Sequence, residues 1–548
     1  MNRLWTICAN GLWFLACMPG YLRFRFSVRH VRRCQTKKML GLLRANRETE
    51  YGSRHHFGEI GRWADFQALP VTDFADYRGA VERIMGGAKG VLTADEVRIL
   101  QPTSGSTSAP KLIPHTVYSA QEFQSALDAW IADLFLQRPQ LFLGSQYWSI
   151  SPATEPKASG ESRVPVGFLD DAEYFGKRRR WIMDGIMAVP AGVRHIADIR
   201  VNQYVTLLFL LRARDLRLIS VWHPSFLTLL MGILRAEWPR LLDDLEQGGI
   251  DASMAVPAQV RRELERQLNP VPKRAAELCG IDLESKVLGC KIWPDLEVIS
   301  CWREGNMELE IAELTTLFPD VLIQGKGLLA TEGVVSIPMG PAQQQICAVT
   351  SHVVEFMDDS GVVFPVWSVK SGESYRVILT TAGGLYRYQL NDRVKVTGFD
   401  HQAPCLRFLG RAGVVSDSVG EKLHLEHVEE LLGEIIREYL QEPRFVMLVP
   451  SGTGQTRGYN LLLEPSDGVL PDVLSMVKAL DFGLCRNYHY AHARELGQLK
   501  PANVTMVRPD ARNRYLNFMT TQGALAGTVK FPALCTAAGI ESQLIGNS

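Results

Sequence analysis

The chain has 548 residues, more than a single compact core usually holds, so we expect two or more domains. Hydrophobic residues make up 46% and charged residues 22%, which is typical of a globular protein. Lys and Arg number 59, the same as Asp and Glu, and no basic tail is present. This balance argues against a protein that recruits nucleic acid through a global positive field.

Ten cysteines are scattered along the chain, and none forms a C-x-x-C pair. Cys279, Cys290 and Cys301 are evenly spaced, but the gaps are too long for a zinc knuckle. Scattered single cysteines in a large chain are typical of a reducing compartment. We therefore predict a cytoplasmic protein without a disulfide framework.

An uncharged apolar stretch, residues 4–22, lies between Arg3 and an arginine cluster that starts at Arg23. Asn10 and Gly11 interrupt the stretch and Pro19-Gly20 breaks it, so it barely reaches the roughly 20 apolar residues of a membrane span. We expect a first helix packed on the body of the protein. Peripheral contact with a membrane surface and a signal peptide are the alternatives.

Hydrophobic periodicity places helices and strands alternately along the first part of the chain. Helices are predicted over 28–47, 121–136, 203–214, 224–236 and 258–267. Short apolar runs predict buried strands at 218–222 and 296–301. This alternation favours a mostly parallel sheet with helices on both faces.

The pattern of predicted helices and strands changes at about residue 345 and again near Arg411. Consecutive strands are predicted at 347–357, 375–381, 385–390, 393–399 and 406–409, which form a β-rich subdomain of meander or barrel type. Helices at 425–440 and 472–480 and strands at 444–449 and 459–463 follow. The prediction is an α/β fold with a large domain, 1–410, that includes a β-barrel-like part over about 345–410, and a small mobile α+β domain, 411–548.

A loop rich in small hydroxyl residues is the strongest local signal. Residues 101–116 read Q-P-T-S-G-S-T-S-A-P-K-L-I-P-H-T. Backbone N–H groups and hydroxyls of such a loop suit an anion, Gly105 allows close approach, and Lys111 adds positive charge, so phosphate is the expected guest. The Walker A spacing is absent, and an ordinary Ser/Thr-rich surface turn is the alternative.

Two acidic residues follow in turn-like contexts. Glu332 lies in Q-G-K-G-L-L-A-T-E-G, residues 324–333, where it could hold Mg²⁺ beside a triphosphate or act as an ordinary surface or capping carboxylate. Asp392 lies in L-Y-R-Y-Q-L-N-D, residues 385–392, at a predicted turn between two strands. A carboxylate there could accept both hydroxyls of a ribose, and an ordinary Asn-Asp hairpin turn is the alternative.

A fourth segment, residues 408–430, contains Arg411, where the predicted pattern changes, and His424 and His427 three residues apart. The two histidines lack a third ligand and the zincin spacing, so an amphipathic helix is favoured over a metal site. Arg411 is a candidate hinge residue.

These segments together resemble the acyl-acid amido synthetases of the Gretchen Hagen (auxin-responsive promoter) family, most closely its bacterial members, within the superfamily of adenylate-forming enzymes. The resemblance rests on T-S-G-S-T-x-x-P-K, then T-E-G, then L-Y-R-Y-x-x-x-D, then G-R-x-G-V-V-S, in this order. It covers nearly the whole chain, and it implies the adenylate-forming enzyme fold. Ser108 and Asn391 stand where the family usually has glycine.

The resemblance implies a role for each motif residue. The ATP phosphates would be held by Thr103, Ser104, Gly105, Ser106, Thr107 and Lys111. Thr331 and Glu332 would adjoin the nucleotide, with Glu332 placing Mg²⁺, and Asp392 would bind the ribose with Arg411 nearby. A lysine near the C-terminus would bridge the acyl carboxylate and the α-phosphate. Lys530 is the best match, and Lys500 and Lys422 are rivals.

The acyl or adenine pocket would be bordered by Trp222, Ser220 and Phe226. The implied function is ATP-dependent activation of a carboxylic acid to an acyl-adenylate, followed by transfer to an amine. Small molecules would be the partners, and nucleic acid would not. Thioester formation with CoA or a carrier protein, and a catalytically degenerate nucleotide-binding protein, are the alternatives. The identities of the acid and the acceptor, and the oligomeric state, are left open.

Overall fold

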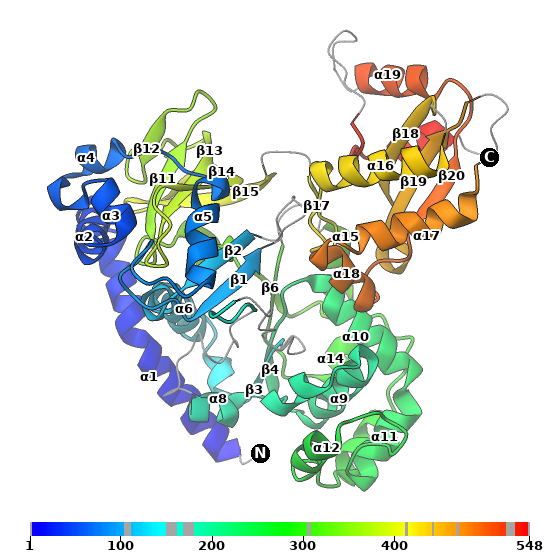
Figure 1. Ribbon diagram of the computed structural model, residues 1–548. Coiled ribbons are helices and arrows are strands. Elements are labelled where there is room, and N and C mark those ends of the chain that lie inside the picture. The colour runs from blue at the N-terminus through cyan, green and yellow to red at the C-terminus, as the bar shows by residue number, and fades with distance from the viewer. Residues whose placement is uncertain are drawn as a thin grey trace. The chain divides into compact units, whose positions relative to one another are not determined.

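The computed structural model describes residues 3–103, 111–149, 162–167, 180–303, 308–411, 415–440, 443–466, 471–521 and 532–545 (Figure 1). These residues form two compact units whose boundary falls between Gly410 and Arg411. Unit 1 holds the described residues up to Gly410, and unit 2 holds those from Arg411 onward. No helix among the described residues is long and apolar enough to cross a membrane.

A four-stranded parallel sheet forms one half of unit 1, with strand order β3-β4-β5-β6. Its strands are β3 (Ser145–Trp148), β4 (Leu216–Ser220), β5 (Val298–Cys301) and β6 (Leu322–Gly325). Successive side chains of a strand point to opposite faces. Leu218 accordingly packs in a different core cluster from Ile219, and Val298 in a different one from Ile299. Both faces of this sheet are therefore covered, as predicted from the sequence.

Helices bury the two faces of the parallel sheet. The face of Ile219 packs with helices that include α9 (Ile199–Arg212), α10 (Pro224–Ala236), α11 (Trp238–Gln247), α12 (Ala258–Glu265), α13 (Pro272–Cys279), α14 (Leu288–Ile292) and α15 (Glu308–Leu317). The opposite face packs with helices α1 (Arg3–Ser27), α6 (Val117–Gln137) and α8 (Arg180–Ile186). The expected helices at 121–136, 203–214, 224–236 and 258–267 are all present.

The β-rich half of unit 1 is a seven-stranded sheet of order β12-β11-β13-β14-β15-β10-β9. Its strands are β9 (Ser336–Met339), β10 (Gln344–Cys347), β11 (Val353–Met357), β12 (Val363–Pro365), β13 (Ser374–Thr380), β14 (Tyr388–Asp400) and β15 (Ala403–Arg411). The single strand predicted at 347–357 is wrong, because a turn at 348–352 separates β10 from β11.

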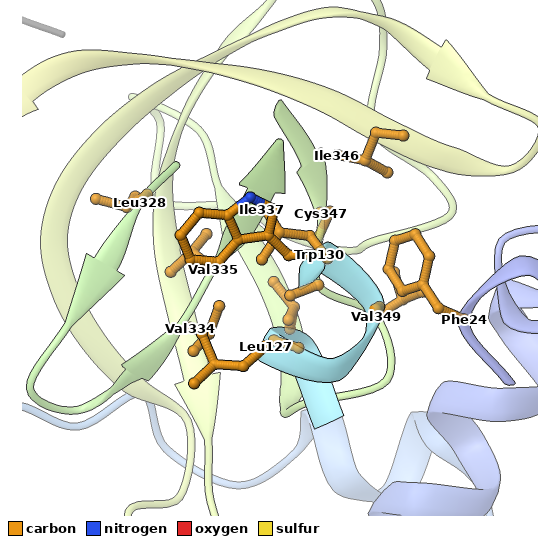
Figure 2. Packing of buried hydrophobic residues seen from close by; sticks show 14 of the residues in the cluster. Phe24, Leu127, Trp130, Leu328, Val334, Val335, Ile337, Ile346, Cys347 and Val349 are labelled. Carbon is orange, nitrogen blue, oxygen red and sulfur yellow. The ribbon is translucent and has the colours of Figure 1, made fainter. Parts of the chain in front are cut away.

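The main core of unit 1 lies where α6 meets the β-rich half. Figure 2 shows Trp130 and Leu127 of α6 against Val334, Ile337 and Cys347. A fully buried aromatic or aliphatic side chain contributes roughly 1.5–3 kcal/mol through removal of apolar surface from water. This shared core therefore fixes α6 relative to the segment 328–349.

Unit 1 contains five further helices in its first 85 residues. They are α2 (Val31–Ala45), α3 (Glu50–Arg54), α4 (Trp63–Gln67), α5 (Phe74–Met85) and the short η1 (Phe57–Glu59), and the 3-10 segments η2 (Pro139–Leu143) and η4 (Ala191–His195) lie elsewhere in unit 1. Two hairpins complete the unit: β1 (Ile99–Thr103) with β2 (Lys111–His115), and β7 (Leu329–Ala330) with β8 (Gly333–Val334).

The N-terminal apolar stretch is a helix packed on unit 1, as expected. However, α1 runs unbroken through Pro19 and Gly20, where the sequence predicted a break. Proline inside a helix removes one backbone hydrogen bond. Trp13, Cys17 and Phe24 are fully buried on one side of α1, and this packing offsets the lost bond.

Unit 2 is a small α+β structure with its own core. Its strands are β16 (Val415–Ser416), β17 (Leu423–His424), β18 (Phe445–Ser451), β19 (Gly458–Glu464) and β20 (Asn503–Met506). Its helices are α16 (Leu425–Tyr439), α17 (Val473–Leu484), α18 (Tyr488–Glu495), α19 (Ala511–Thr521), α20 (Ile540–Ile545) and the short η5 (Gly454–Thr456). The sheet order is β18-β19-β20, with β20 parallel to β19. Val428, Leu431 and Ile435 bury one side of α16, so this helix is amphipathic as predicted.

Candidate active site

The β1–β2 hairpin fixes both ends of the predicted phosphate loop. Its antiparallel register pairs Thr103 with Lys111, so residues 104–110 connect the last pair of the ladder. Lys111 is half-buried at the start of β2. Ser104, Gly105, Ser106 and Thr107 lie outside the described residues. Lys111 starts β2 directly after these residues, and His115 at the other end of β2 precedes α6, where the Thr116 hydroxyl accepts a hydrogen bond from the Ser119 N–H.

The T-E-G segment forms a tight turn beside this hairpin. Ala330 pairs with Gly333, which leaves Thr331 and Glu332 as the two turn residues. His115, the last residue of β2, hydrogen-bonds through its ring to the backbone of Thr331. Burial lowers the pKa of His115 to about 4, although this hydrogen bond acts in the opposite direction. His115 is therefore neutral at pH 7 and serves as a link between the hairpin and the turn.

Two glycines allow neighbouring segments to approach each other closely. A Cβ atom at Gly383 would lie 2.4 Å from the carbonyl oxygen of Pro114 on β2. A Cβ atom at Gly333 would lie 2.6 Å from Nε2 of His352. Neither position tolerates a larger side chain without movement of its neighbour. The T-T-A-G-G segment, 380–384, consequently lies against β2.

A buried carboxylate, Glu122 on α6, ties these segments together. Its oxygens lie 3.0 Å from Lys38 Nζ and 3.0 Å from His352 Nδ1, and the backbone N–H of Ala382 donates to it at 2.8 Å. Burial by itself raises the pKa of Glu122, but the charges of Lys38 and His352 and the hydrogen bonds outweigh burial, so the pKa is lowered. Nothing in the local sequence around Glu122 signals this junction.

Asp392 is not in a hairpin turn, and that prediction is wrong. It lies within the long strand β14, where the pairing with β13 shifts register between Arg376 and Ile378. Asn391 takes a left-handed conformation with φ 64° at this irregularity. The Asp392 carboxylate is buried on the side of the strand that also buries Leu390 and Val394.

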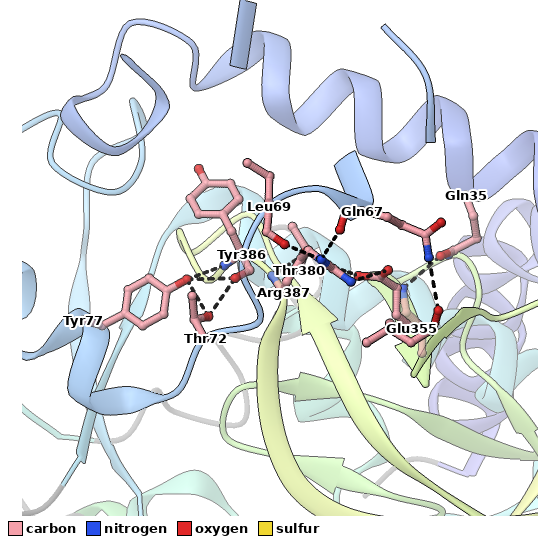
Figure 3. Close-up of polar contacts among 11 residues, drawn as sticks. Gln35, Gln67, Leu69, Thr72, Tyr77, Glu355, Thr380, Tyr386 and Arg387 are labelled. Carbon is pink, nitrogen blue, oxygen red and sulfur yellow. Dashed lines mark hydrogen bonds and ion pairs between the residues drawn. The ribbon is translucent and has the colours of Figure 1, made fainter. Parts of the chain in front are cut away.

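The L-Y-R-Y motif before it holds the fold together. Figure 3 shows Arg387 in an ion pair with the buried Glu355 at 2.8 Å, and the same guanidinium donates to the backbone carbonyls of Gln67 and Leu69. Tyr77 donates its hydroxyl to the Tyr386 carbonyl at 3.0 Å. Burial raises the pKa of Glu355, and Arg387 opposes that shift. The motif therefore anchors the chain segment after α4 to the sheet.

A lysine enclosed by tryptophans lies at the carboxyl end of the parallel sheet. Lys326 follows β6, is only 5% exposed, and donates to the Ser220 hydroxyl at 2.6 Å. Its ammonium lies 5.3–5.6 Å from the ring centroids of Trp222, Trp130 and Trp148. Ser220 and Trp222 were predicted to share a pocket, and Lys326 brings them together. Its position directly after a buried strand, in Q-G-K-G, is the signal that identifies it.

A cavity of about 240 Å³ adjoins Lys326. Of the eight described residues that line it, three carry positive charge and none is acidic. They are Trp302, Arg303, Gly325, Lys326, Gly327, Gln343, Gln345 and Arg407. The cavity lies within unit 1, and its lining suits an anionic or acceptor-rich ligand.

The remaining predicted residues are more dispersed. Phe226 is half-buried on α10 and packs against the helical core. Arg411 ends β15 at the unit boundary. Lys530 lies outside the described residues, whereas its rivals Lys500, which is exposed, and Lys422, which has φ 41°, belong to unit 2.

Three domain models of one protein family match most of the chain. Residues 21–323 match the GH3 family N-terminal domain, 346–411 the GH3 family central domain, and 424–538 the GH3 family C-terminal domain. The chain belongs to the GH3 family. The Gretchen Hagen resemblance predicted from the motifs is thereby confirmed, while the bacterial affiliation stays a prediction.

Several plant proteins of the GH3 family are similar to this chain. A probable indole-3-acetic acid-amido synthetase, GH3.6 of Oryza sativa subsp. japonica, is 27% identical over 379 residues, covering 63% of this chain and 77% of the relative. The indole-3-acetic acid-amido synthetase GH3.15 of Arabidopsis thaliana is 22% identical, covering 92% of this chain and 91% of the relative.

Solved structures show the same fold. The GH3.15 acyl acid amido synthetase in complex with 2,4-DB has a TM-score of 0.67 at 19% identity, covering 97% of this chain and 96% of that one. A 2-hydroxyisobutyryl-CoA ligase in complex with 2-HIB-AMP and CoA has a TM-score of 0.51 at 12% identity, covering 92% and 90%. This GH3 chain therefore has the adenylate-forming enzyme fold, as predicted.

Proposed function

We propose that this GH3 protein is a ligase that activates a carboxylic acid with ATP and transfers the acyl group to an amine. The observation that carries the proposal is the convergence, within unit 1, of the phosphate-loop hairpin, the Thr331–Glu332 turn and the segment 380–384. These segments are far apart in sequence. The names of similar GH3 proteins, which are amido synthetases, also support the proposal.

In the first half-reaction the acid's carboxylate attacks the α-phosphorus of ATP, and pyrophosphate leaves. Two anions must approach each other, so the site must supply positive charge and aligned donors. Lys111 and the loop 103–107 would bind the phosphates, Thr331 would adjoin the nucleotide, and Asp392 would accept the ribose hydroxyls. An opposite charge at about 4 Å, in a medium of effective dielectric about 20, contributes roughly 4 kcal/mol before desolvation.

A magnesium ion fits this arrangement through one protein carboxylate. Glu332 is half-buried in a two-residue turn next to the hairpin that carries the phosphate loop. Mg²⁺ is usually bound by one or two carboxylates together with substrate phosphate oxygens and water. Within the described parts of the chain no group of three or more His, Cys, Asp or Glu forms a ready-made site. Glu332 with the triphosphate is thus the proposed ligand set.

In the second half-reaction an amine attacks the acyl carbon of the acyl-adenylate and expels AMP. A lysine of unit 2, with Lys530 as the first choice, would bridge the acyl carboxylate and the α-phosphate, and Arg411 at the unit boundary would act as the hinge for movement of the small domain. A thioester-forming enzyme shares the first half-reaction and the fold. The names of the GH3 relatives favour the amine.

Acid-dependent exchange between pyrophosphate and ATP tests the first half-reaction. The wild-type protein, offered a broad panel of carboxylic acids, should exchange with at least one of them. Asp392→Ala and Lys111→Ala should each lower the exchange rate by about 10²-fold or more, because each removes an interaction made with the nucleotide. No exchange with any acid would instead favour a degenerate nucleotide-binding protein.

The acceptor is tested by offering free amino acids, CoA and a carrier-protein thiol in parallel to the acid that supports exchange. Amide product with AMP release supports the proposal, and thioester product alone contradicts it. We propose a cytoplasmic location, where ATP and free amino acids are both present, and a small-molecule acid and amine as the only substrates besides ATP.

A further inference from the structure

One side of α1 is apolar and open to solvent along the whole helix. Leu15 is 63% exposed, Leu22 60% and Phe26 52%. Exposed members of this row are spaced three or four residues apart, so they share one helix face. The row consists of Leu4, Cys8, Leu12, Leu15, Pro19, Leu22 and Phe26. We refer to these seven residues as the α1 stripe.

The opposite side of α1 is fixed to unit 1. Trp13, Cys17 and Phe24 are fully buried there, and the Asn10 side chain donates to the Gly144 carbonyl at 2.8 Å. A helix bonded along one side cannot be surrounded by lipid. Figure 1 shows α1 along the outside of unit 1, next to α6 and α8. The stripe is therefore the outer surface of a docked helix.

Positive charge is concentrated next to the stripe. The first 47 residues contain ten Lys or Arg and no Asp or Glu, in a chain whose net charge is zero. Arg25 and Lys38 make ion pairs with Asp400 and Glu122. Other cations of this segment are exposed, namely Arg23, Arg29, Arg32, Arg33 and Lys37.

Two indoles lie at the other end of the helix. Trp5 of α1 stacks on Trp181 of α8 with ring centroids 5.6 Å apart, and both are at least 40% exposed. Indole rings favour the boundary between lipid headgroups and acyl chains. The face thus combines an apolar row, a cationic end and exposed tryptophans, the composition of helices that lie in a membrane interface.

We propose that the α1 stripe and the exposed cations after it bind the surface of an anionic lipid bilayer, with the helix axis parallel to the membrane plane. The apolar row enters the headgroup boundary, and the arginines bind lipid phosphates.

A second copy of the chain fits the same face less well. In a symmetric dimer the same patch meets itself. The segment 1–47 supplies no acid to pair with its own cations. An anionic bilayer supplies negative charge at every point along the helix.

The test is co-sedimentation of the full chain with vesicles. Vesicles of phosphatidylcholine with an equal part of phosphatidylglycerol should bind the wild-type protein, and vesicles of phosphatidylcholine alone should bind it about tenfold more weakly or less. High salt should weaken binding to the anionic vesicles, because it screens the arginines. Leu15→Glu/Leu22→Glu should weaken binding to anionic vesicles by about tenfold or more.

A matched control replaces two apolar residues of unit 2 that are at least as exposed, as Leu474→Glu/Phe482→Glu on α17. This control should bind vesicles like the wild-type protein. All three proteins should have the same far-ultraviolet circular dichroism, because each changed residue is exposed. The proposal is overturned if the wild-type protein does not bind anionic vesicles, or if both double variants bind equally. A concentration-dependent dimer that only Leu15→Glu/Leu22→Glu disrupts, without vesicle binding, would also overturn it.

Discussion

At the residue scale, Arg387 constrains the fold through both its backbone and its side chain. Its backbone has a left-handed φ of 49°, and its guanidinium pairs with a carboxylate that is almost completely buried. The sequence placed this residue in a nucleotide motif, yet its contacts connect the end of α4 to the sheet. A residue of a nucleotide-binding motif can therefore be needed for folding without taking part in the reaction.

Arg387→Met should destabilise the protein by about 3–5 kcal/mol, because Glu355 would stay buried without its cation. Urea unfolding followed by circular dichroism measures this. The double variant Arg387→Met/Glu355→Met should recover much of the loss. As a control, Arg393→Met removes a pair with Asp359 in which both side chains are solvent-exposed, and should cost less than about 1 kcal/mol. Equal losses in Arg387→Met and Arg393→Met would contradict this reading.

We propose that Lys326 contacts the acid, because it lines a cavity whose described lining residues include three cations and no acidic residue. Lys326→Met should raise the KM for the acid by about tenfold or more, since it removes the ammonium beside the cavity, while the KM for ATP changes little. The exchange assay measures both constants. Lys291→Met, an exposed lysine on α14, is the matched control and should leave both unchanged. A change confined to the ATP constant would place Lys326 at the nucleotide instead.

At the element scale, the contact between segment 380–384 and β2 depends on a missing side chain. Gly383→Ala should push the segment away from Pro114, destabilise the protein by about 1–3 kcal/mol and lower the exchange rate. Gly398→Ala, also in a β-rich context but with open space around it, should change neither. Thermal unfolding and the exchange assay test both variants, and an unaffected Gly383→Ala would argue against the close packing.

Several elements could be predicted from the sequence because their signals are local. The helix at Pro224–Ala236 and the buried strands β4 and β5 follow from apolar runs and periodicity. The continuity of α1 could not be predicted, because Pro19 locally favours the end of a helix. Burial of Trp13 and Phe24 against residues far away in the sequence offsets that effect. The irregularity at Asn391 likewise depends on pairing with β13, which the local sequence does not show.

At the scale of the whole molecule, the site combines what was predictable with what was not. The motifs singled out the loop between Thr103 and Lys111, the turn that holds Thr331 and Glu332, and Asp392, but they placed Asp392 in a turn and the structure places it within β14. The Glu122 junction joins α2, α6, His352 and Ala382 across more than 200 residues. An ordinary glutamate within a helix gives no local signal of such contacts. The contact between Lys326 and Ser220 could be inferred only once the order of the parallel strands was known.

Unit 2 should have a stability that depends on pH through Glu421. Burial first, and repulsion from Asp417, raise the pKa of this carboxyl to about 7. The folded state therefore holds a proton that the unfolded state releases near pH 4.5. The proton on Glu421 therefore stabilises the folded state by on the order of 3 kcal/mol below pH 4.5. This stabilisation is lost as pH rises through about 7.

Hydrogen exchange of the β18 and β19 amides between pH 5 and 8, corrected for intrinsic rates, measures this dependence. Protection in the wild-type protein should fall as pH rises. Glu421→Gln cannot ionise, so its protection should change less over the same range. Identical pH profiles for the two proteins would rule out Glu421 as the titrating group.

The enclosure of Lys326 has an optical consequence. All eleven tryptophans precede residue 411, and three of them surround a single ammonium group. Indole emission depends on nearby charge, so an acid that neutralises Lys326 should alter the intrinsic fluorescence of the protein. Occupancy of the site could then be followed in real time by stopped-flow mixing, without a label and before any bond is made.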